Sequence, residues 1–277
     1  RQKQGALTFE TLKSKSLFDH DMLRDLVLEE RNRAKDIIED FMVMANGVIA
    51  RYLASKNFPS LRRVVRVPKR WDRIVEIASE ENFKLPDRPD SKLLEKFLTM
   101  RRAADPLRFP DLSLAIIKLL GAGEYVAAIP QETAAPGHFG LAVKEYAHFT
   151  APNRRYPDLA MQRLLKAALA GKPIPYSNQE LTELGAYCTE REDAAKKVER
   201  QVDKSAAALL LESHLGQKFD AFVTGASSKG TWARLIKPPV EGKMIQGFRG
   251  LDVGDRIRVQ LVNTDVENGF IDLKRAK

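Results

Sequence analysis

The stretch HFTAPNRRYPDL, residues 148–159, places two adjacent arginines, Arg154 and Arg155, between two prolines. Each proline fixes its own φ angle and disfavours helix at the residue before it, which leaves the loop few conformations. The loop leads into a helical pattern, and the free N–H groups at a helix N-terminus favour anions. Two guanidinium groups at such a place can bind phosphate oxygens. The stretch therefore predicts a phosphate-binding loop, and the alternative is a structural arginine pair that bridges carboxylates such as Asp158.

The composition is that of a globular protein with a full hydrophobic core. The chain has 277 residues, of which 44% are hydrophobic and 30% charged, enough for one large domain or one large and one small domain. A net charge of +9 favours a polyanionic partner. A single cysteine, Cys188, excludes internal disulfides and cysteine-based zinc sites, and we expect a reducing, cytoplasmic environment. No run of about 18 apolar residues predicts a membrane span.

Apolar residues recur at helical spacing over most of the first 215 residues. After the short apolar run GALTF, the pattern predicts a long helix over residues 18–55. Further helices are predicted over residues 69–82, 91–102 and 111–120. The runs EYVAAIP and FGLAVKEYAHF, residues 124–130 and 139–149, predict buried strands.

Two more predicted helices and a β-rich C-terminal segment complete the chain. One helix begins with Pro157 in its first turn and ends at Gly171. Ser177 and Glu180 form a capping-box pattern that opens a second long helix, which reaches about His214. The remaining residues form short β-rich segments separated by glycine turns, as in a small closed or partly closed barrel. We therefore expect an α+β protein with one domain over residues 1–215 and a barrel over residues 216–277.

The arginine loop belongs to a series of ordered motifs. YAHFTAPNRRYPDLAMQRLL resembles the signature of the RNase II (RNB) family of exoribonucleases, whose usual form is Y-x-H-F-T-S-P-I-R-R-Y-x-D-L. Five more segments resemble family motifs in the family's order: RQKQGALTFE, AKDIIEDFMVMANGVIARYL, HFGLAVKEYAHFT, YCTEREDAAKKVER and VGDRIRVQLVNTDVENGFIDLKR. The last is similar to the final strands of a ribosomal-type RNA-binding OB module. The resemblance spans nearly the whole chain.

The resemblance implies an α+β fold, the helix-rich C-terminal part of an RNB catalytic domain followed by an OB barrel. It implies a processive enzyme that removes nucleoside 5′-monophosphates one at a time from the 3′ end of single-stranded RNA. In that family water attacks the phosphodiester, and two Mg²⁺ ions stabilise the attacking and leaving oxygens.

The resemblance also assigns roles to residues of the catalytic part. Arg154 and Arg155 would hold phosphates of the 3′-terminal nucleotides, one of them at the scissile phosphate, with the choice between them left open. Phe9 would stack on a terminal base, whereas the residue pattern alone favours a core strand residue. Glu39 and Asp40 would engage the ribose, where the 2′-hydroxyl separates RNA from DNA.

Further RNA contacts are expected around the loop and in the barrel. Glu190 would lie near the active site, the alternative being a solvated helix charge. The loop adds surfaces for stacking or hydrogen bonds, namely His148, Phe149, Thr150 and Tyr156. The barrel candidates are Phe222, Lys229, Trp232 and Phe248, and some of the aromatic ones must be core because small barrels fill their interior with side chains.

The sequence departs from the family pattern at several positions. Asn153 replaces the usual isoleucine, Ala151 the usual serine, and Asp40 shortens the second carboxylate of its pair. More important, the chain holds no D-x₅-D-x-D-D run, the family's set of Mg²⁺ ligands. We therefore expect these ligands in an upstream segment, the N-terminal part of the same enzyme as a partner, and no hydrolysis by this chain alone.

Two alternatives remain at this stage. The chain could be a non-catalytic RNA-binding protein derived from the same family, which the absent aspartates favour. It could also be a basic protein that engages DNA through the arginine loop, and in either case binding should weaken steeply with salt.

Overall fold

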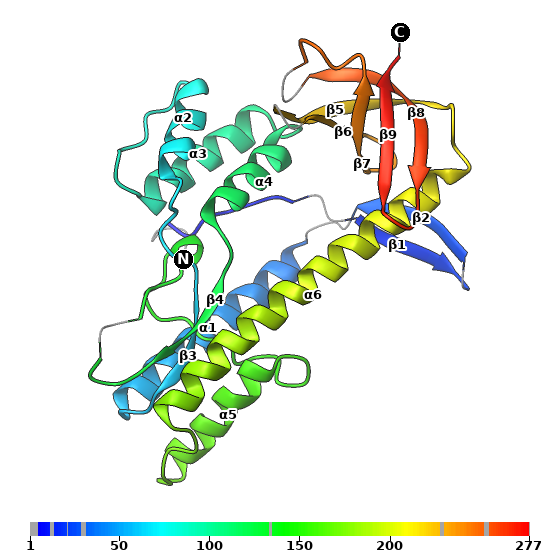
Figure 1. Ribbon diagram of the computed structural model, residues 1–277. Helices are drawn as coiled ribbons and strands as arrows, with labels where there is room; N and C mark the ends of the chain where they lie inside the picture. Colours follow the sequence, from blue (N-terminus) through cyan, green and yellow to red (C-terminus); the bar gives the residue numbers. More distant parts are fainter. Residues whose placement is uncertain are drawn as a thin grey trace. The chain divides into compact units, whose positions relative to one another are not determined.

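The computed structural model describes residues 5–11, 14–20, 22–28, 32–132, 135–227, 230–251 and 255–276 (Figure 1). The chain forms two compact units. One comprises Arg1–Glu10 and Arg31–Asp193, and the other Thr11–Glu30 and Ala194–Lys277. Each unit is described by itself. The predicted division into domains at residue 215 stays a prediction, because these units follow packing and not chain order.

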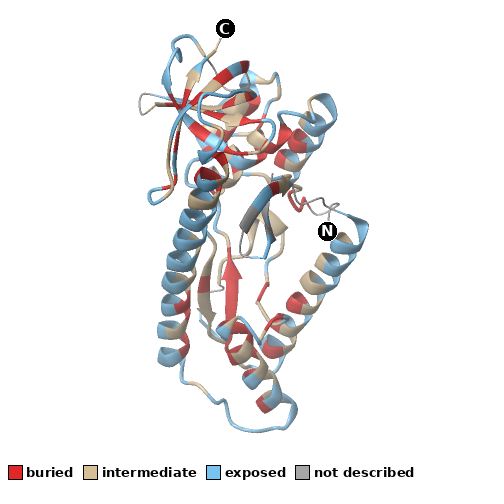
Figure 2. Ribbon diagram, turned by 90° about the vertical axis from the view of Figure 1, so that its right-hand side faces the viewer, coloured by how far each residue is buried: buried red, intermediate tan, exposed pale blue. Residues whose placement is uncertain are grey.

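The first unit is built around a buried two-stranded sheet. Strand β3 (Ser60–Val64) pairs antiparallel with β4 (Glu124–Ala128), and every residue of β3 is buried (Figure 2). Helices α1 (Arg33–Ser55) and α5 (Tyr156–Leu169) pack against β3, and Leu181 at the start of α6 (Asn178–Glu212) joins the same core. This arrangement brings the arginine loop, which precedes α5, next to α1 and the sheet.

Three short helices form a second core in the same unit. They are α2 (Trp71–Glu80), α3 (Ser91–Ala104) and α4 (Phe109–Leu120). Trp71, Phe97 and Phe109 are buried between them, and Leu7 from the start of the chain packs into the same cluster. The segment that carries Phe9 is therefore anchored to this helical cluster.

The second unit contains the barrel that the sequence predicts. Five strands close it in the order β5-β6-β7-β9-β8, with β5 (Lys218–Ser227), β6 (Gly230–Leu235), β7 (Glu241–Gln246), β8 (Arg256–Asp265) and β9 (Phe270–Arg275). Alternate residues fill its interior, among them Val223, Leu235 and Leu273, and Leu211 near the end of α6 packs into this core. The fold is α+β, with helices followed by a closed barrel.

One helix prediction was wrong in its first part. Residues 18–55 do not form one helix: β1 (Ser14–Asp19) and β2 (Met22–Leu28) pair as an antiparallel hairpin, and α1 begins only at Arg33. The helix begins there because the side chain of Asn32 accepts a hydrogen bond from Lys35 N, a standard N-cap. The apolar spacing of the hairpin resembles a helical pattern, which is why periodicity alone failed.

One predicted strand was also wrong. Residues 139–149 contain a short 3₁₀ helix, η2 (Phe139–Leu141), followed by Ala142 in the left-handed region at φ 52°. A positive φ interrupts an extended strand, so the apolar run forms a folded loop instead. The predicted capping box at the start of α6 is confirmed, since Ser177 N donates to Glu180 Oε2 at 2.7 Å and Glu180 N donates to Ser177 Oγ at 3.2 Å. Of the helices in the described part of the chain, none has the length and apolar character needed to cross a membrane.

Candidate functional site

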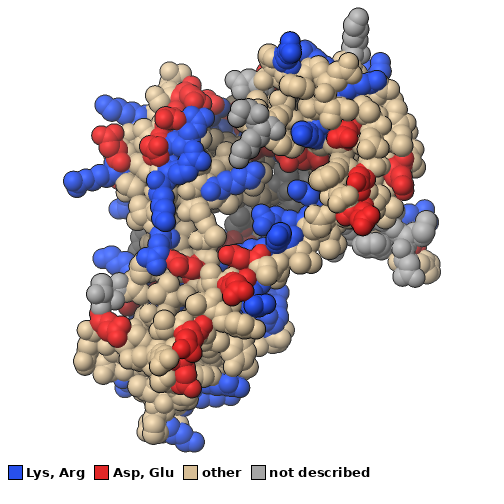
Figure 3. All heavy atoms as spheres, in the orientation of Figure 1, with Lys and Arg blue, Asp and Glu red and all other residues tan. Residues whose placement is uncertain are grey.

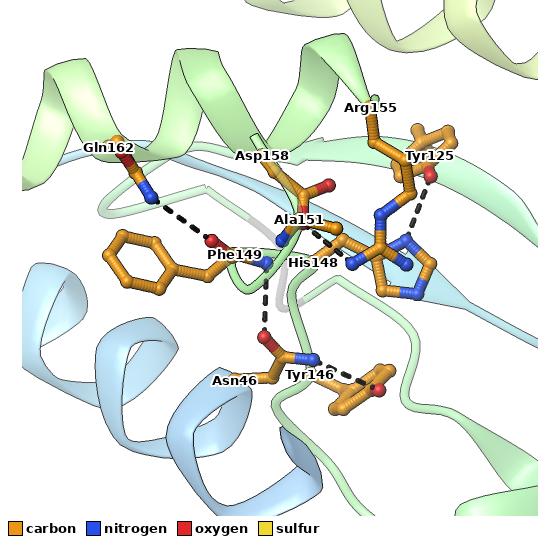
Figure 4. Close-up of polar contacts among 9 residues, drawn as sticks. All are labelled: Asn46, Tyr125, Tyr146, His148, Phe149, Ala151, Arg155, Asp158 and Gln162. Carbon is orange, nitrogen blue, oxygen red and sulfur yellow. Dashed lines mark hydrogen bonds and ion pairs between the residues drawn. The ribbon is translucent and has the colours of Figure 1, made fainter. Parts of the chain in front are cut away.

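The arginine loop is a tight turn fastened to the first turn of α5. Arg154 N and Arg155 N both donate to Ala151 O, at 3.2 and 3.0 Å. The side chain of Asp158 is fully buried, and its Oδ1 accepts from Ala151 N at 2.8 Å and from Arg155 Nη2 at 2.6 Å (Figure 4). One carboxylate thus fixes both ends of the loop.

The two arginines are placed differently. Arg155 forms the ion pair with Asp158 that the structural alternative describes, yet 26% of its side chain is still exposed. Arg154 is exposed. The loop therefore presents one oriented and one solvent-exposed guanidinium, so the structural and the phosphate-binding interpretation of Arg155 are compatible.

The rings of Tyr125, His148 and Tyr146 form a row that packs next to the loop. His148 Nδ1 lies 2.8 Å from the hydroxyl of Tyr125, and its ring meets the edge of Tyr146 at a centroid distance of 5.7 Å. Asn46, buried in α1, donates to the hydroxyl of Tyr146 at 3.1 Å and accepts from Phe149 N at 3.0 Å (Figure 4). These contacts tie α1, β4 and the loop together.

Several residues around the loop were not singled out in the sequence, among them Asn46, Tyr125, Tyr146, Arg63 and Glu192. Arg63 in β3 forms a bidentate ion pair with Glu192 in α6, with N–O distances of 2.6 and 2.8 Å. The guanidinium carbon of Arg63 also lies 4.7 Å from the ring centroid of Tyr125. Burial raises the pKa of Tyr125 to about 12, although the nearby Arg63 opposes this. An available signal was the adjacent pair Arg62 and Arg63 inside an apolar stretch, because a buried arginine favours a carboxylate partner.

A pocket of about 310 Å³ in the first unit brings together Phe9, Glu39 and His138. Phe9 is half-buried: it packs against the helical core and also lines the pocket, although it lies outside any strand. Its stacking on a base stays a prediction. His138 connects this pocket to the ring row, since its ring meets the edge of Tyr146 at 5.5 Å. Burial, with a smaller effect of Arg63, lowers the pKa of His138 to about 4, and its Nδ1 accepts from Leu141 N at 3.1 Å.

The remaining predicted residues of this unit differ in their surroundings. Asp40, Thr150 and Tyr156 are exposed. Phe149 is partly buried against the core between α1 and α5. Glu190 is exposed and lies 2.9 Å from Arg191 on the same helix, which matches the solvated-charge alternative, while Glu192 two residues later points to Arg63.

In the barrel, Phe222 and Trp232 lie on the outer face. Both alternate with buried residues of their strands and are half-buried. Phe222 faces Arg234 across the ladder, and Trp232 faces Lys243. Phe248 is 38% exposed. Lys229 lies outside the described residues.

The described residues do not fit a Mg²⁺ centre. Within the described ranges there is no group of three or more His, Cys, Asp or Glu side chains that could hold a metal ion. Hard Mg²⁺ is bound through clustered carboxylates, waters and phosphates, and the acids of this site serve other partners, as Asp158 and Glu192 do.

Comparison with known proteins shows which domain families the chain matches. Residues 1–171 match the RNB domain, and residues 217–276 match the RNase II-type exonuclease C-terminal S1 domain. Ribonuclease R 1 of Lactococcus lactis is 26% identical over 99% of this chain and 36% of its own length. RNase R of Mycoplasma genitalium, solved with ribose-methylated single-stranded RNA, superposes with a TM-score of 0.86 at 22% identity, over 99% of this chain and 47% of that one. Yeast Ssd1, described as a pseudonuclease, gives a TM-score of 0.65 at 19% identity, over 78% of this chain and 27% of that one.

The chain thus spans between about a quarter and a half of the length of these relatives. Its motifs, its helices around the β3–β4 sheet and its closed barrel agree with the two matched domains. The chain belongs to the RNB family of RNase II-type exonucleases and carries the C-terminal S1 domain of that family.

Proposed function

We propose that this chain is the C-terminal part of a processive exoribonuclease that hydrolyses single-stranded RNA from its 3′ end and releases nucleoside 5′-monophosphates. The observation that carries the proposal is the connection between the Phe9 pocket and the arginine loop through the rings of His138, Tyr146 and His148. If the terminal base of an RNA stacks on Phe9, its phosphates would lie toward the arginine loop, which these rings connect to the pocket. Stacking on an aromatic ring contributes about 1–3 kcal/mol per base and is insensitive to base identity.

Within the proposal, each polar group has a separate task. Glu39 would accept a hydrogen bond from a ribose 2′-hydroxyl, with Asp40 beside it on α1 as a second acceptor. Arg155, oriented by Asp158, would hold one phosphate in a fixed direction, and the exposed Arg154 would close on a second one. Glu190 would act near the site only if it leaves Arg191, which makes it the weakest assignment.

The barrel would hold the RNA before it reaches the first unit. Phe222 and Trp232 offer rings on an outer face that also carries Arg234 and Lys243, and Phe248 offers an exposed ring after β7. Rings interleaved with basic side chains are typical of surfaces that bind single strands without sequence preference. Lysine and arginine side chains are spread over both units (Figure 3), in line with the net charge of +9, so binding should depend strongly on salt.

The metal ligands and the N-terminal part of the enzyme would come from outside this chain. The misfit of the described residues to Mg²⁺ supports this, and so does a row of apolar residues left exposed on α1. This row comprises Ile37, Ile38, Phe41, Met44 and Val48, whose side chains are 47–68% exposed. An exposed apolar stripe of this kind marks a surface that another polypeptide covers.

Release of mononucleotides tests the proposal. A 3′-tailed RNA would be incubated in Mg²⁺ buffer with the chain alone and with the chain produced together with the segment encoded immediately upstream. We expect nucleoside 5′-monophosphates only from the second preparation. Turnover by the chain alone would refute the assignment of the metal ligands to another segment.

A second candidate function is RNA binding without hydrolysis. The lack of a metal-binding cluster in the described part of the chain favours it. In that case both preparations would bind the RNA and neither would shorten it. The DNA-binding alternative is tested by competition between RNA and DNA strands of one sequence, where equal affinity would contradict an RNA-specific site.

A further inference from the structure

A larger pocket in the first unit has no part in the proposed RNA site. It measures about 990 Å³ and is lined by the end of α1, the start of β3, the end of β4 and the loop around Lys144. These elements lie together at the lower left of Figure 1. Four basic side chains line it, Arg51, Arg62, Lys92 and Lys144, against the single acidic side chain of Glu145. The excess of positive charge indicates an anionic ligand.

Arg62 is the residue that makes this pocket unusual. Its side chain is only 7% exposed, and its Nη1 is buried with no hydrogen-bond partner among the described residues. Nη2 donates to Ala50 O at 3.1 Å. A buried donor without a partner is costly, and more so when it belongs to a charged group, so a ligand oxygen that reached Nη1 would be bound strongly.

The one carboxylate near Arg62 is a loose partner. Glu145 Oε1 lies 3.7 Å from Nη2, beyond hydrogen-bond distance, and 41% of the Glu145 side chain is exposed. Burial lowers the pKa of Arg62, and the neighbouring Arg51 lowers it further against the opposing effect of Glu145. Two cations close together with one loosely held acid are stabilised by an anion that replaces that acid.

The rest of the lining indicates what kind of organic group the anion carries. Much of the remaining lining is apolar, formed by Phe58, Ala128, Ile129, Pro130 and Val143 among others. Phe58 is partly buried, packed against the core of the unit. A ligand with a phosphoryl group at one end and a flat, weakly polar body at the other matches both halves of the lining.

We propose that this pocket binds a phosphate monoester, with the phosphoryl group between Arg51 and Arg62 and the organic part against the apolar wall. Entry of the phosphoryl group displaces Glu145 toward solvent and brings Arg62 Nη1 into a charge-assisted hydrogen bond. Because the pocket is lined by none of the residues assigned to RNA hydrolysis, this inference does not depend on the proposed function.

Calorimetric titration of the chain at constant ionic strength tests the inference. The probes are inorganic phosphate, AMP, adenosine and a 5′-hydroxyl oligoribonucleotide, which has only phosphodiesters. We expect AMP to bind more tightly than phosphate, and adenosine to bind at least about tenfold more weakly than AMP, since charge-assisted hydrogen bonds are worth about 1.5–3 kcal/mol. Equal binding of AMP and adenosine, or binding of the oligoribonucleotide alone, would overturn the phosphate-monoester assignment.

Variants locate the site without removing buried groups. Arg51→Ala should weaken AMP about fivefold, and Glu145→Gln should tighten it by a similar factor, because exposed charges contribute about 1 kcal/mol or less. Lys56→Ala is the matched control: it removes one exposed positive charge near the same end of α1, outside the pocket lining, and should leave the affinity unchanged. If Arg51→Ala and Glu145→Gln leave AMP binding unchanged, the ligand binds elsewhere and the inference fails.

Discussion

Arg155 and Asp158 form an ion pair across the first turn of α5, with 2.6 Å between Nη2 and Oδ1, and the same oxygen accepts from Ala151 N. The carboxylate is fully buried, while a quarter of the arginine side chain reaches solvent. The fold therefore holds Asp158 in place, and Asp158 in turn positions Arg155 and the loop. An arginine held in this way offers its remaining donors in a defined direction.

Removal of the carboxylate should destabilise the protein. We expect Asp158→Ala to lower the free energy of unfolding by about 2–4 kcal/mol, because it breaks an ion pair and leaves Ala151 N without its acceptor. Urea denaturation followed by circular dichroism measures this. Asp193→Ala, which removes an exposed acid from α6, should change stability by no more than about 0.5 kcal/mol. Equal effects of the two substitutions would contradict the role given to Asp158.

The ion pair between Arg63 and Glu192 should couple β3 to α6. In a double-mutant cycle with Arg63→Met and Glu192→Gln, we expect a coupling free energy of about 1–3 kcal/mol, since the pair is two-pronged and the arginine side chain is 9% exposed. The exposed pair of Arg66 and Glu124 in the same unit is the matched control and should give less than about 1 kcal/mol. Similar coupling free energies for both pairs would mean that burial does not strengthen the ion pair of Arg63 and Glu192.

Features with a local cause could be predicted from the sequence. The capping box of Ser177 and Glu180 placed the start of α6 correctly, because its hydrogen bonds join residues three apart. The barrel was found because glycine turns divide its sequence into short β-rich segments, which is a local signal. The RNA-site residues rest on the motif and stay predictions.

Features that depend on distant residues could not be predicted. The hairpin of β1 and β2 has the apolar spacing of a helix, and only its cross-strand pairing decides against one. The partner of Arg63 is 129 residues away, so no local pattern reveals that Glu192 and not Glu190 faces the core. The loose contact of Arg62 with Glu145 likewise exists only once β3 and the loop around Lys144 are folded together.

His138 should make stability depend on pH. Burial lowers its pKa to about 4 in the folded protein from the ordinary value of 6.5, so the unfolded state binds more protons between these values. The contribution of His138 to the free energy of unfolding is therefore complete above about pH 6.5. It is lost as the pH falls toward 4, by up to about 1.4 kcal/mol per pH unit. His138→Asn keeps an acceptor for Leu141 N but cannot titrate, and its unfolding free energy should fall less between pH 7 and pH 5.

The exposed His20 supplies the comparison for this experiment. His20→Asn removes an exposed imidazole in place of a buried one, and asparagine tolerates the positive φ of 53° at this position. If His138→Asn and His20→Asn have the same pH profile, the buried imidazole is not the source of the dependence.

Arg154 and Phe9 should affect RNA binding in different ways. Arg154→Ala removes one cation from the phosphate path, so the slope of log K against log salt for a single-stranded RNA should decrease in size by about 0.7. Phe9→Ala removes a stacking ring and should cost about 1–3 kcal/mol without a change in this slope. Fluorescence anisotropy of a labelled oligoribonucleotide at several KCl concentrations measures both. Phe270→Ala, an exposed ring in β9 outside the proposed surface, should alter neither quantity. A slope that is unchanged by Arg154→Ala would remove this arginine from the phosphate contacts and leave Arg155 as the cation of the loop.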